Sequence, residues 1–301
     1  MLMERSSPSE LLIRQRLAAL TRVLPAAQRG DVRSLHHARV ATRRLREALP
    51  LLVSGTRARK LERVVRRLTR ALGPVRELDV ALINLDELER DGEMPKAALS
   101  RLRETVEEER RRLHAEMRRT VEDIDLDKLT KRAVSAARKT PSVPPRGRVR
   151  DPQRLAAARL RAARRATAVR AAIENAAGIY LPDRLHEVRI AVKKLRYAME
   201  LARELSGSRA VAAIQLLKEG QDLLGRMHDL EILIARTRAV QGSPVGTNLR
   251  LSGDLDRLVR RLETECRQLH GHYMALRHKL LAICDRVEAV PRRPATAAPA
   301  A

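Results

Sequence analysis

Apolar residues recur every three or four positions along most of the chain, and polar residues fill the positions between them. For example, Leu61, Val65, Leu68 and Leu72 would share one face of a helix. A period of about 3.6 residues is typical of amphipathic helices. We therefore predict helices over about residues 9–24, 31–53 or 34–53, 56–90, 95–121, 126–138, 153–177, 184–205, 209–240 and 249–288.

Proline and glycine mark the predicted helix ends. Pro25 is expected to end the first helix at about Leu24, and the pair Gly73-Pro74 is expected to kink or interrupt the third. Residues 141–152 are rich in proline and basic side chains and have no periodicity, which is typical of a linker. We predict an all-α protein of two antiparallel four-helix bundles related by internal duplication, residues 1–140 and 153–290, with a disordered tail over residues 291–301.

Two stretches of the chain have nearly the same sequence. Residues 35–52 read LHHARVATRRLREALPLL, residues 185–202 read LHEVRIAVKKLRYAMELA, and eight of these 18 positions are identical. A second matched pair follows each stretch: LGPVRELD at residues 72–79 and LGRMHDLE at residues 224–231. Duplication at so long a period indicates two related domains and not a solenoid of short repeats.

The repeat places basic residues at helical spacing. Steps of three and four residues bring side chains onto one face of a helix, about 5–6 Å apart. Three stripes follow this rule: the first stripe is His36, Arg39, Arg43 and Arg46, the second stripe is His186, Arg189, Lys193 and Arg196, and the third stripe is Arg59, Arg63, Arg66 and Arg70. Like charges at this spacing repel each other, and an anionic ligand lying along a stripe would relieve that repulsion.

Further basic residues accompany the stripes. Arg44 and Lys194 directly follow a stripe residue in each copy of the repeat, and Lys218 matches Arg66 at an offset of 152 residues. We include these residues among the candidate binding residues. Arg70 matches Asp222, so this charge is not repeated. The acidic residues of the second matched pair are expected to hold basic side chains in position.

Composition narrows the class of partner. The 301 residues include 62 Lys and Arg against 37 Asp and Glu, which gives a formal net charge of +25. This charge favours a polyanion: nucleic acid, an anionic membrane surface or a phosphate polymer. The chain has no Phe or Trp and three Tyr, so it lacks the aromatic platforms on which proteins stack single-stranded bases. No apolar run reaches membrane-spanning length and no signal peptide is visible, so we expect a cytoplasmic protein without membrane insertion.

Motifs of catalysis and metal binding are missing from the sequence. It has no G-x-x-x-x-G-K-[ST], G-x-G-x-x-G or G-x-S-x-G pattern, and His186-Glu187 is not followed by the second histidine of a zincin. Cys266 and His270 lie four residues apart, but two ligands do not make a zinc site. We expect a protein that is not an enzyme and that needs no metal or cofactor.

The two copies HHARVATRRLR with LGPVRELD, and HEVRIAVKKLR with LGRMHDLE, resemble the CHAD (conserved histidine α-helical domain) family over roughly residues 10–285. The resemblance implies two four-helix bundles related by pseudo-twofold symmetry, and a basic surface that binds inorganic polyphosphate at polyphosphate granules. The family's histidine would fall on His36 and His186. Its basic positions would fall on Arg39, Arg43, Arg44, Arg46, Arg189, Lys193, Lys194 and Arg196. The E-x-E-x-K signature of the triphosphate tunnel domain, which many relatives carry, is missing from this sequence.

The residues alone leave two other functions open. Binding of duplex nucleic acid through its phosphates would also use the positive charge. A scaffold that docks acidic partners through its basic face is a third class. The role of His36 and His186 is open as well, because each could contact the ligand directly or orient a neighbouring side chain.

Overall fold

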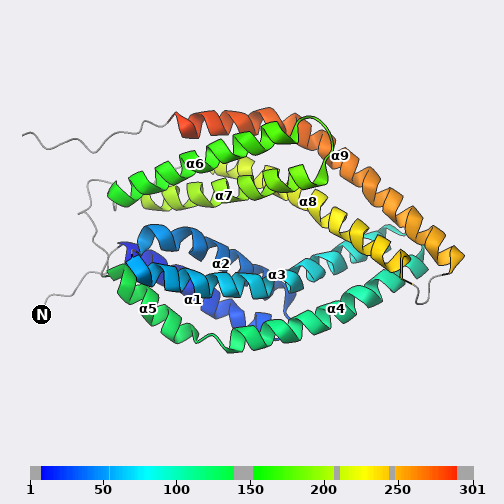
Figure 1. The fold of residues 1–301 in the computed structure, drawn as a ribbon, viewed down its shortest axis with the longest axis horizontal. Helices are drawn as coiled ribbons and strands as arrows, with labels where there is room; N and C mark the ends of the chain where they lie inside the picture. Colours follow the sequence, from blue (N-terminus) through cyan, green and yellow to red (C-terminus); the bar gives the residue numbers. More distant parts are fainter. Residues whose placement is uncertain (1–7, 54, 139–151, 207–210, 244–247, 290–301) are drawn as a thin grey trace, which may run out of the picture. The chain divides into compact units, whose positions relative to one another are not determined.

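The computed structural model describes residues 8–53, 55–138, 152–206, 211–243 and 248–289. Within these ranges it contains helices and no strand, so the all-α prediction is confirmed (Figure 1). The helices are α1 (Pro8–Gln28), α2 (Val32–Leu52), α3 (Gly55–Asp91), α4 (Lys96–Glu122), α5 (Leu126–Arg138), α6 (Pro152–Ala176), α7 (Pro182–Ser206), α8 (Val211–Gln241) and α9 (Leu249–Glu288). None of them is long and apolar enough over the described residues to cross a membrane.

Two prolines lie inside helices: Pro25, where the first helix was expected to end, and Pro74, where the third was expected to kink or be interrupted. Helix α1 continues past Pro25 to Gln28, and α3 runs without interruption through Pro74. A proline removes a single backbone N–H donor and strains the preceding turn. Leu72 and Val75, on either side of Pro74, are fully buried. Burial of such side chains contributes about 1.5–3 kcal/mol each, which offsets the cost of the proline.

The described helices divide into two compact units, and the division differs from the predicted domain boundary. Unit 1 contains residues 8–138 and 226–269, and unit 2 contains residues 152–225 and 270–289. Helices α8 and α9 have 31 and 40 residues, and each contributes one part to each unit. Residues 226–269, which were expected in the second bundle, therefore belong to unit 1. The predicted linker, apart from Pro152, and the predicted tail lie outside the described residues.

Unit 1 has a core of aliphatic side chains. Helix α1 packs on α2, α2 packs on α3, and α3 packs on α4 (Figure 1). The fully buried side chains include Ile13, Leu17, Leu20, Leu35, Leu45, Leu49, Leu52, Leu68, Leu72 and Leu78. These residues lie on the apolar seams that the sequence periodicity predicted.

Unit 2 is built around the contact between α6 and α7 (Figure 1). Its core includes Val169, Ile173, Val188, Leu195 and Tyr273, each almost completely buried. Arg170 of α6 forms ion pairs with Asp285 and Glu288 of α9, which attaches the end of α9 to this unit.

Candidate anion-binding site

Helix α2 carries the first stripe on one side and its apolar seam on the other. Asp31 caps the helix, because its carboxylate accepts a hydrogen bond from the amide of Ser34 at 2.7 Å. The apolar side is buried in unit 1 through Leu35, Ala38, Ala41, Leu45 and Ala48. The stripe residues remain partly or fully exposed, so the folded helix presents their charges at the surface.

Helix α3 adds further cations to the surface of α2. The pKa of the Arg46 guanidinium is lowered mainly by burial and next by the positive charge of Arg66. Glu47 opposes this effect, while Arg43 and Arg70 lower the pKa further. These influences place Arg66 and Arg70 of the third stripe within electrostatic range of Arg46 in the first.

His36 is influenced by neighbouring cations as well. Burial lowers its pKa below the usual 6.5, and the nearby charges of Arg76, His37, Arg43 and Arg39 lower it further. Arg76 of α3 was not among the predicted site residues. The steps of three and four that connect Arg66 and Arg70 continue through Gly73 to Arg76, so the spacing contained a signal for it.

We call this group the α2–α3 cluster; its members are His36, Arg39, Arg43, Arg46, Arg66, Arg70 and Arg76. Within the part of the chain that the structure describes, Arg43, Arg46, Arg66 and Arg70 form no ion pair with a carboxylate. The predicted residue Arg63 is exposed on α3 and likewise forms no such pair among the described residues. Concentrated and uncompensated positive charge of this kind is the main requirement for binding phosphate groups.

A glycine brings Arg39 close to the backbone of α3. A Cβ atom at residue 73 would lie 2.9 Å from Nη1 of Arg39, closer than carbon and nitrogen atoms approach in a normal contact. The motif LGPVRELD therefore contributes Gly73 as the point where a guanidinium of α2 rests on α3. At the matched position of the second copy, a Cβ on Gly225 would meet nothing within 4 Å.

The acidic residues of the same motif hold structural arginines. Asp79, which is 1% exposed, accepts a hydrogen bond at 2.7 Å from Nε of Arg110 on α4. A second nitrogen of Arg110 donates to the carbonyl of Gly30 at 3.1 Å. Glu77 lies 3.6 Å from Arg236 of α8. These pairs fix α3 against its neighbours and thereby fix the helix that carries half of the cluster.

The second stripe has a different environment. Arg196 is 9% exposed and donates to Oε1 of Glu200 at 2.5 Å and to Oε1 of Gln221 at 3.0 Å. Its guanidinium also lies 4.5 Å from the ring centre of Tyr197. The corresponding Arg46 is exposed, and Pro50 occupies the position that Glu200 has in the second copy. Arg196 is thus committed to internal contacts.

Other residues of the second copy are also compensated. Lys218 lies 3.5 Å from Asp222, the acidic residue that replaces Arg70. The pKa of His186 is lowered by burial and by Arg189 and Lys193, but Asp183 and Glu187 act in the opposite direction. Arg44 and Lys194 are exposed but lie roughly 100° around the helix from their neighbours in the stripes. The structure therefore brings the predicted residues together more completely in the first copy than in the second.

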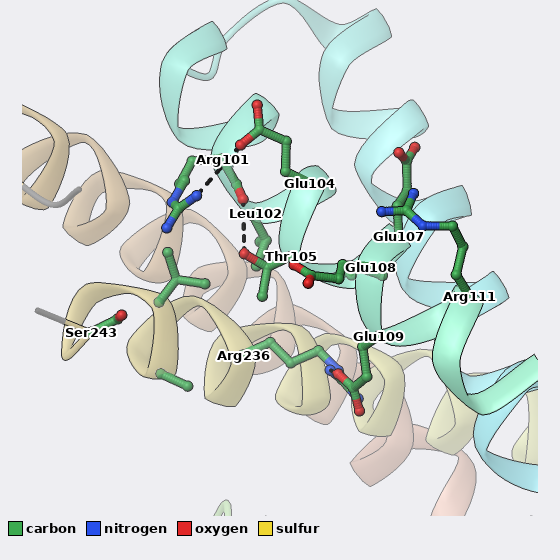
Figure 2. A pocket seen from close by; sticks show the side chains of 13 residues that line it. Arg101, Leu102, Glu104, Thr105, Glu107, Glu108, Glu109, Arg111, Arg236 and Ser243 are labelled. Atoms are coloured by element: carbon green, nitrogen blue, oxygen red, sulfur yellow. Dashed lines mark hydrogen bonds and ion pairs between the residues drawn. The ribbon is translucent and has the colours of Figure 1, made fainter. Parts of the chain in front are cut away.

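An open groove of about 670 Å³ lies between α4 and α8 in unit 1, and no predicted residue lines it. Figure 2 shows Glu104, Glu107, Glu108 and Glu109 along its α4 wall. Arg236 enters from α8 and pairs with Glu109. Its four glutamates slightly outnumber Arg101, Arg111 and Arg236, so the groove offers no excess of positive charge to a polyanion.

Among the described residues, Cys266 and His270 do not belong to a larger group of potential metal ligands. No group of three or more His, Cys, Asp or Glu side chains in the described residues is arranged to hold a metal ion. Cys266, which lies four residues before His270 on α9, is fully buried, and its thiol lies 3.9 Å from the carbonyl oxygen of Met227.

Comparisons with known proteins agree with this architecture. A model of the CHAD domain matches residues 11–238. PptA from Streptomyces chartreusis superimposes with a TM-score of 0.65 at 17% identity, covering 89% of this chain and 97% of that one. The CHAD domain from the plant Ricinus communis gives a TM-score of 0.58 at 19% identity, covering 97% and 96% of the two chains. Identities this low show a shared fold alone, and a search of curated proteins finds no match.

Proposed function

This chain is a member of the CHAD-domain family, and on that premise we propose that it binds inorganic polyphosphate through the α2–α3 cluster without catalysing a reaction. The observation that carries the proposal is the set of exposed arginines on two neighbouring helices that have no carboxylate partner among the described residues. Arginine suits this role because its planar guanidinium can donate two parallel hydrogen bonds to phosphate oxygens.

A linear phosphate polymer fits the chemistry of the cluster. Its charges repeat along the chain, as the guanidinium groups do along α2 and α3, and it has no bases that would need stacking groups. Binding would relieve the electrostatic repulsion between Arg46, Arg66 and Arg70 and release counterions from both partners. Binding of this kind would place the protein at polyphosphate granules.

Duplex nucleic acid is the alternative ligand, because it also offers phosphates at the surface. A titration decides between the two. Polyphosphate of defined length would be added to the labelled protein at several salt concentrations, with pyrophosphate and duplex DNA as competitors at equal phosphate concentration. We expect polyphosphate to bind most tightly, pyrophosphate to compete weakly, and the affinity to fall steeply with salt. Displacement of polyphosphate by duplex DNA at equal phosphate concentration would overturn the proposal.

The non-enzymatic part of the proposal has its own test. Polyphosphate incubated with the protein and divalent cations should keep its length distribution on a gel. Shortening of the polymer that is lost together with binding in a cluster variant would contradict it.

A further inference from the structure

A second groove lies between the first half of α3 and α5, which pack against each other in unit 1. Its volume is about 740 Å³, within the range of sites that receive a ligand or the side chains of a partner. Leu61 and Val64 from α3, with Ile124 and Leu129, give it an apolar floor. Leu61 and Leu129 are buried beneath the groove, at 5% exposed each, and Val64 is partly exposed, so Val64 is the main apolar contact that the floor offers.

The rim of the groove is strongly basic. It consists of Arg57, Lys60, Arg67, Lys128, Lys131 and Arg132, with Asp123 and Asp125 as the only acids, which leaves an excess of four positive charges. Both acids have structural tasks: Asp123 accepts a hydrogen bond from Arg67 at 2.6 Å, and Asp125 accepts one from the amide of Lys128 at 2.7 Å. The other five cations form no ion pair within the described residues.

This groove is separate from the α2–α3 cluster. Residues 57, 60, 64 and 67 face it, whereas residues 59, 63, 66 and 70 form the third stripe. At about 100° per residue, these two sets lie on faces of α3 that are roughly a quarter turn apart. The groove also differs in chemistry, because a phosphate polymer has no apolar surface that could use Leu61, Val64 and Leu129.

We propose that this groove docks an acidic amphipathic helix of a partner protein. The apolar face of such a helix would cover the floor through side chains at i, i+3 or i+4 and i+7. Its flanking Asp and Glu side chains would meet the cations of both walls, which gives charge complementarity along the groove. The α3 wall extends from Arg57 to Arg67, about 15 Å, which corresponds to roughly three helical turns of the partner.

The charge of the groove favours an acidic helix over a small molecule with an alkyl chain and one phosphate group. A single phosphate group carries about two negative charges at most, and would leave half of the excess uncompensated. A helix with three or four carboxylates on its flanks matches the excess of four. The extended shape of the basic rim, with cations on both α3 and α5, also fits an elongated partner.

The experiment uses the full chain and a fluorescent synthetic peptide of about four helical turns, with Leu at i, i+3, i+7 and i+10 and Glu on both flanks. A scrambled peptide of the same composition is the ligand control. We expect the amphipathic peptide to bind and the scrambled peptide to bind at least about tenfold more weakly, because only the first presents apolar and acidic faces together. Equal binding of both peptides, or none by either, would overturn the proposal.

Variants then locate the binding. The double variant Lys60→Glu with Arg132→Glu should lower the affinity for the peptide at least about tenfold. The control variant Arg112→Glu with Arg260→Glu changes the net charge equally but lies outside the groove, so it should have little effect on this affinity. Val64→Thr should lower the affinity for the peptide several-fold while the thermal stability of the protein stays unchanged. Equal losses in the two double variants, or tighter binding of dodecyl phosphate than of the peptide, would contradict the assignment. Polyphosphate affinity should be the same in both double variants, so the failure of this proposal can be told apart from failure of polyphosphate binding.

Discussion

The guanidinium of Arg39 on α2 lies against α3 at Gly73, where a Cβ atom would approach Nη1 within 2.9 Å. This contact connects the two helices that carry the α2–α3 cluster and explains why a glycine occurs in the middle of a long helix. Glycine costs about 1 kcal/mol relative to alanine in a helix interior, and at Gly73 the close approach of Arg39 accompanies that cost. Gly225, at the matched position of the second copy, has no such neighbour.

Gly73→Ala should weaken polyphosphate binding several-fold without unfolding the protein. The new methyl group displaces the end of a flexible side chain, which costs the fold little but moves Arg39 away from its place in the cluster. Gly225→Ala is the matched control: it should raise the melting temperature through helix propensity and leave the affinity unchanged. Calorimetric titration and thermal unfolding of both variants check this prediction, and equal affinities in the two variants would contradict it.

Arg46→Gln should affect mainly polyphosphate affinity and Arg196→Gln mainly stability, although the two arginines occupy the same position of the repeat. Arg46 is exposed among like charges, so its loss should reduce polyphosphate affinity and leave stability nearly unchanged. Arg196→Gln removes the charged partner from a largely buried ion pair with Glu200 and should cost about 3–5 kcal/mol of unfolding free energy. Urea unfolding and polyphosphate titration separate the two effects. A larger loss of affinity in Arg196→Gln, at preserved stability, would refute the asymmetry of the two copies.

Asp79→Asn should destabilise unit 1 by about 3 kcal/mol, because it removes a fully buried carboxylate that compensates Arg110 and influences Arg76. Asp86→Asn is the matched control on the same helix. Asp86 pairs with Arg103 at 2.7 Å, but its side chain is 54% exposed, so its loss should cost less than about 1 kcal/mol. Denaturant unfolding measures both values, and similar costs would show that the Asp79 pair does not hold α3.

Polyphosphate should bind more tightly as the pH falls through and below 6.5. In the free protein the pKa of His36 lies below 6.5 because of burial and the neighbouring arginines. The bound polyanion neutralises those arginines, so the pKa rises on binding and the complex takes up a proton. Titration calorimetry in buffers of different ionisation enthalpy measures this uptake. His36→Gln should reduce it and His278→Gln, on the exposed side of α9, should not; an unchanged uptake in His36→Gln would exclude His36 as its source.

Much of the fold was predictable because the aliphatic seams have a regular period. The end of α2 at Leu52 and both ends of α9 follow from that period and its flanking glycine and proline residues. The uninterrupted course of α3 at Pro74 depends on tertiary packing around Leu72 and Val75, so the local sequence predicted a kink or an interruption there. The membership of residues 226–269 in unit 1 likewise depends on long-range contacts, such as the bond from Arg226 to Asn84 at 2.7 Å.

The candidate site was predictable in its first copy, where helical spacing alone aligns the cations. The commitment of Arg196 was visible in part, because Glu200 lies four residues further along the same helix face. Its bond to Gln221 of α8 requires the packing of two helices and has no local signal. The basic groove between α3 and α5 was missed for the same reason, since residues from two distant segments form its walls.

The most direct test of the account compares two charge-matched variants in a single polyphosphate titration. Arg43→Glu with Arg66→Glu reverses one charge on each helix of the cluster, and Arg112→Glu with Arg260→Glu makes the same change of net charge elsewhere in unit 1. The cluster variant should lose about a hundredfold or more in affinity and show a flatter dependence on salt, while the control stays within a few-fold of the wild type. Equal losses in the two variants would show that net charge, and not the α2–α3 cluster, binds the polymer.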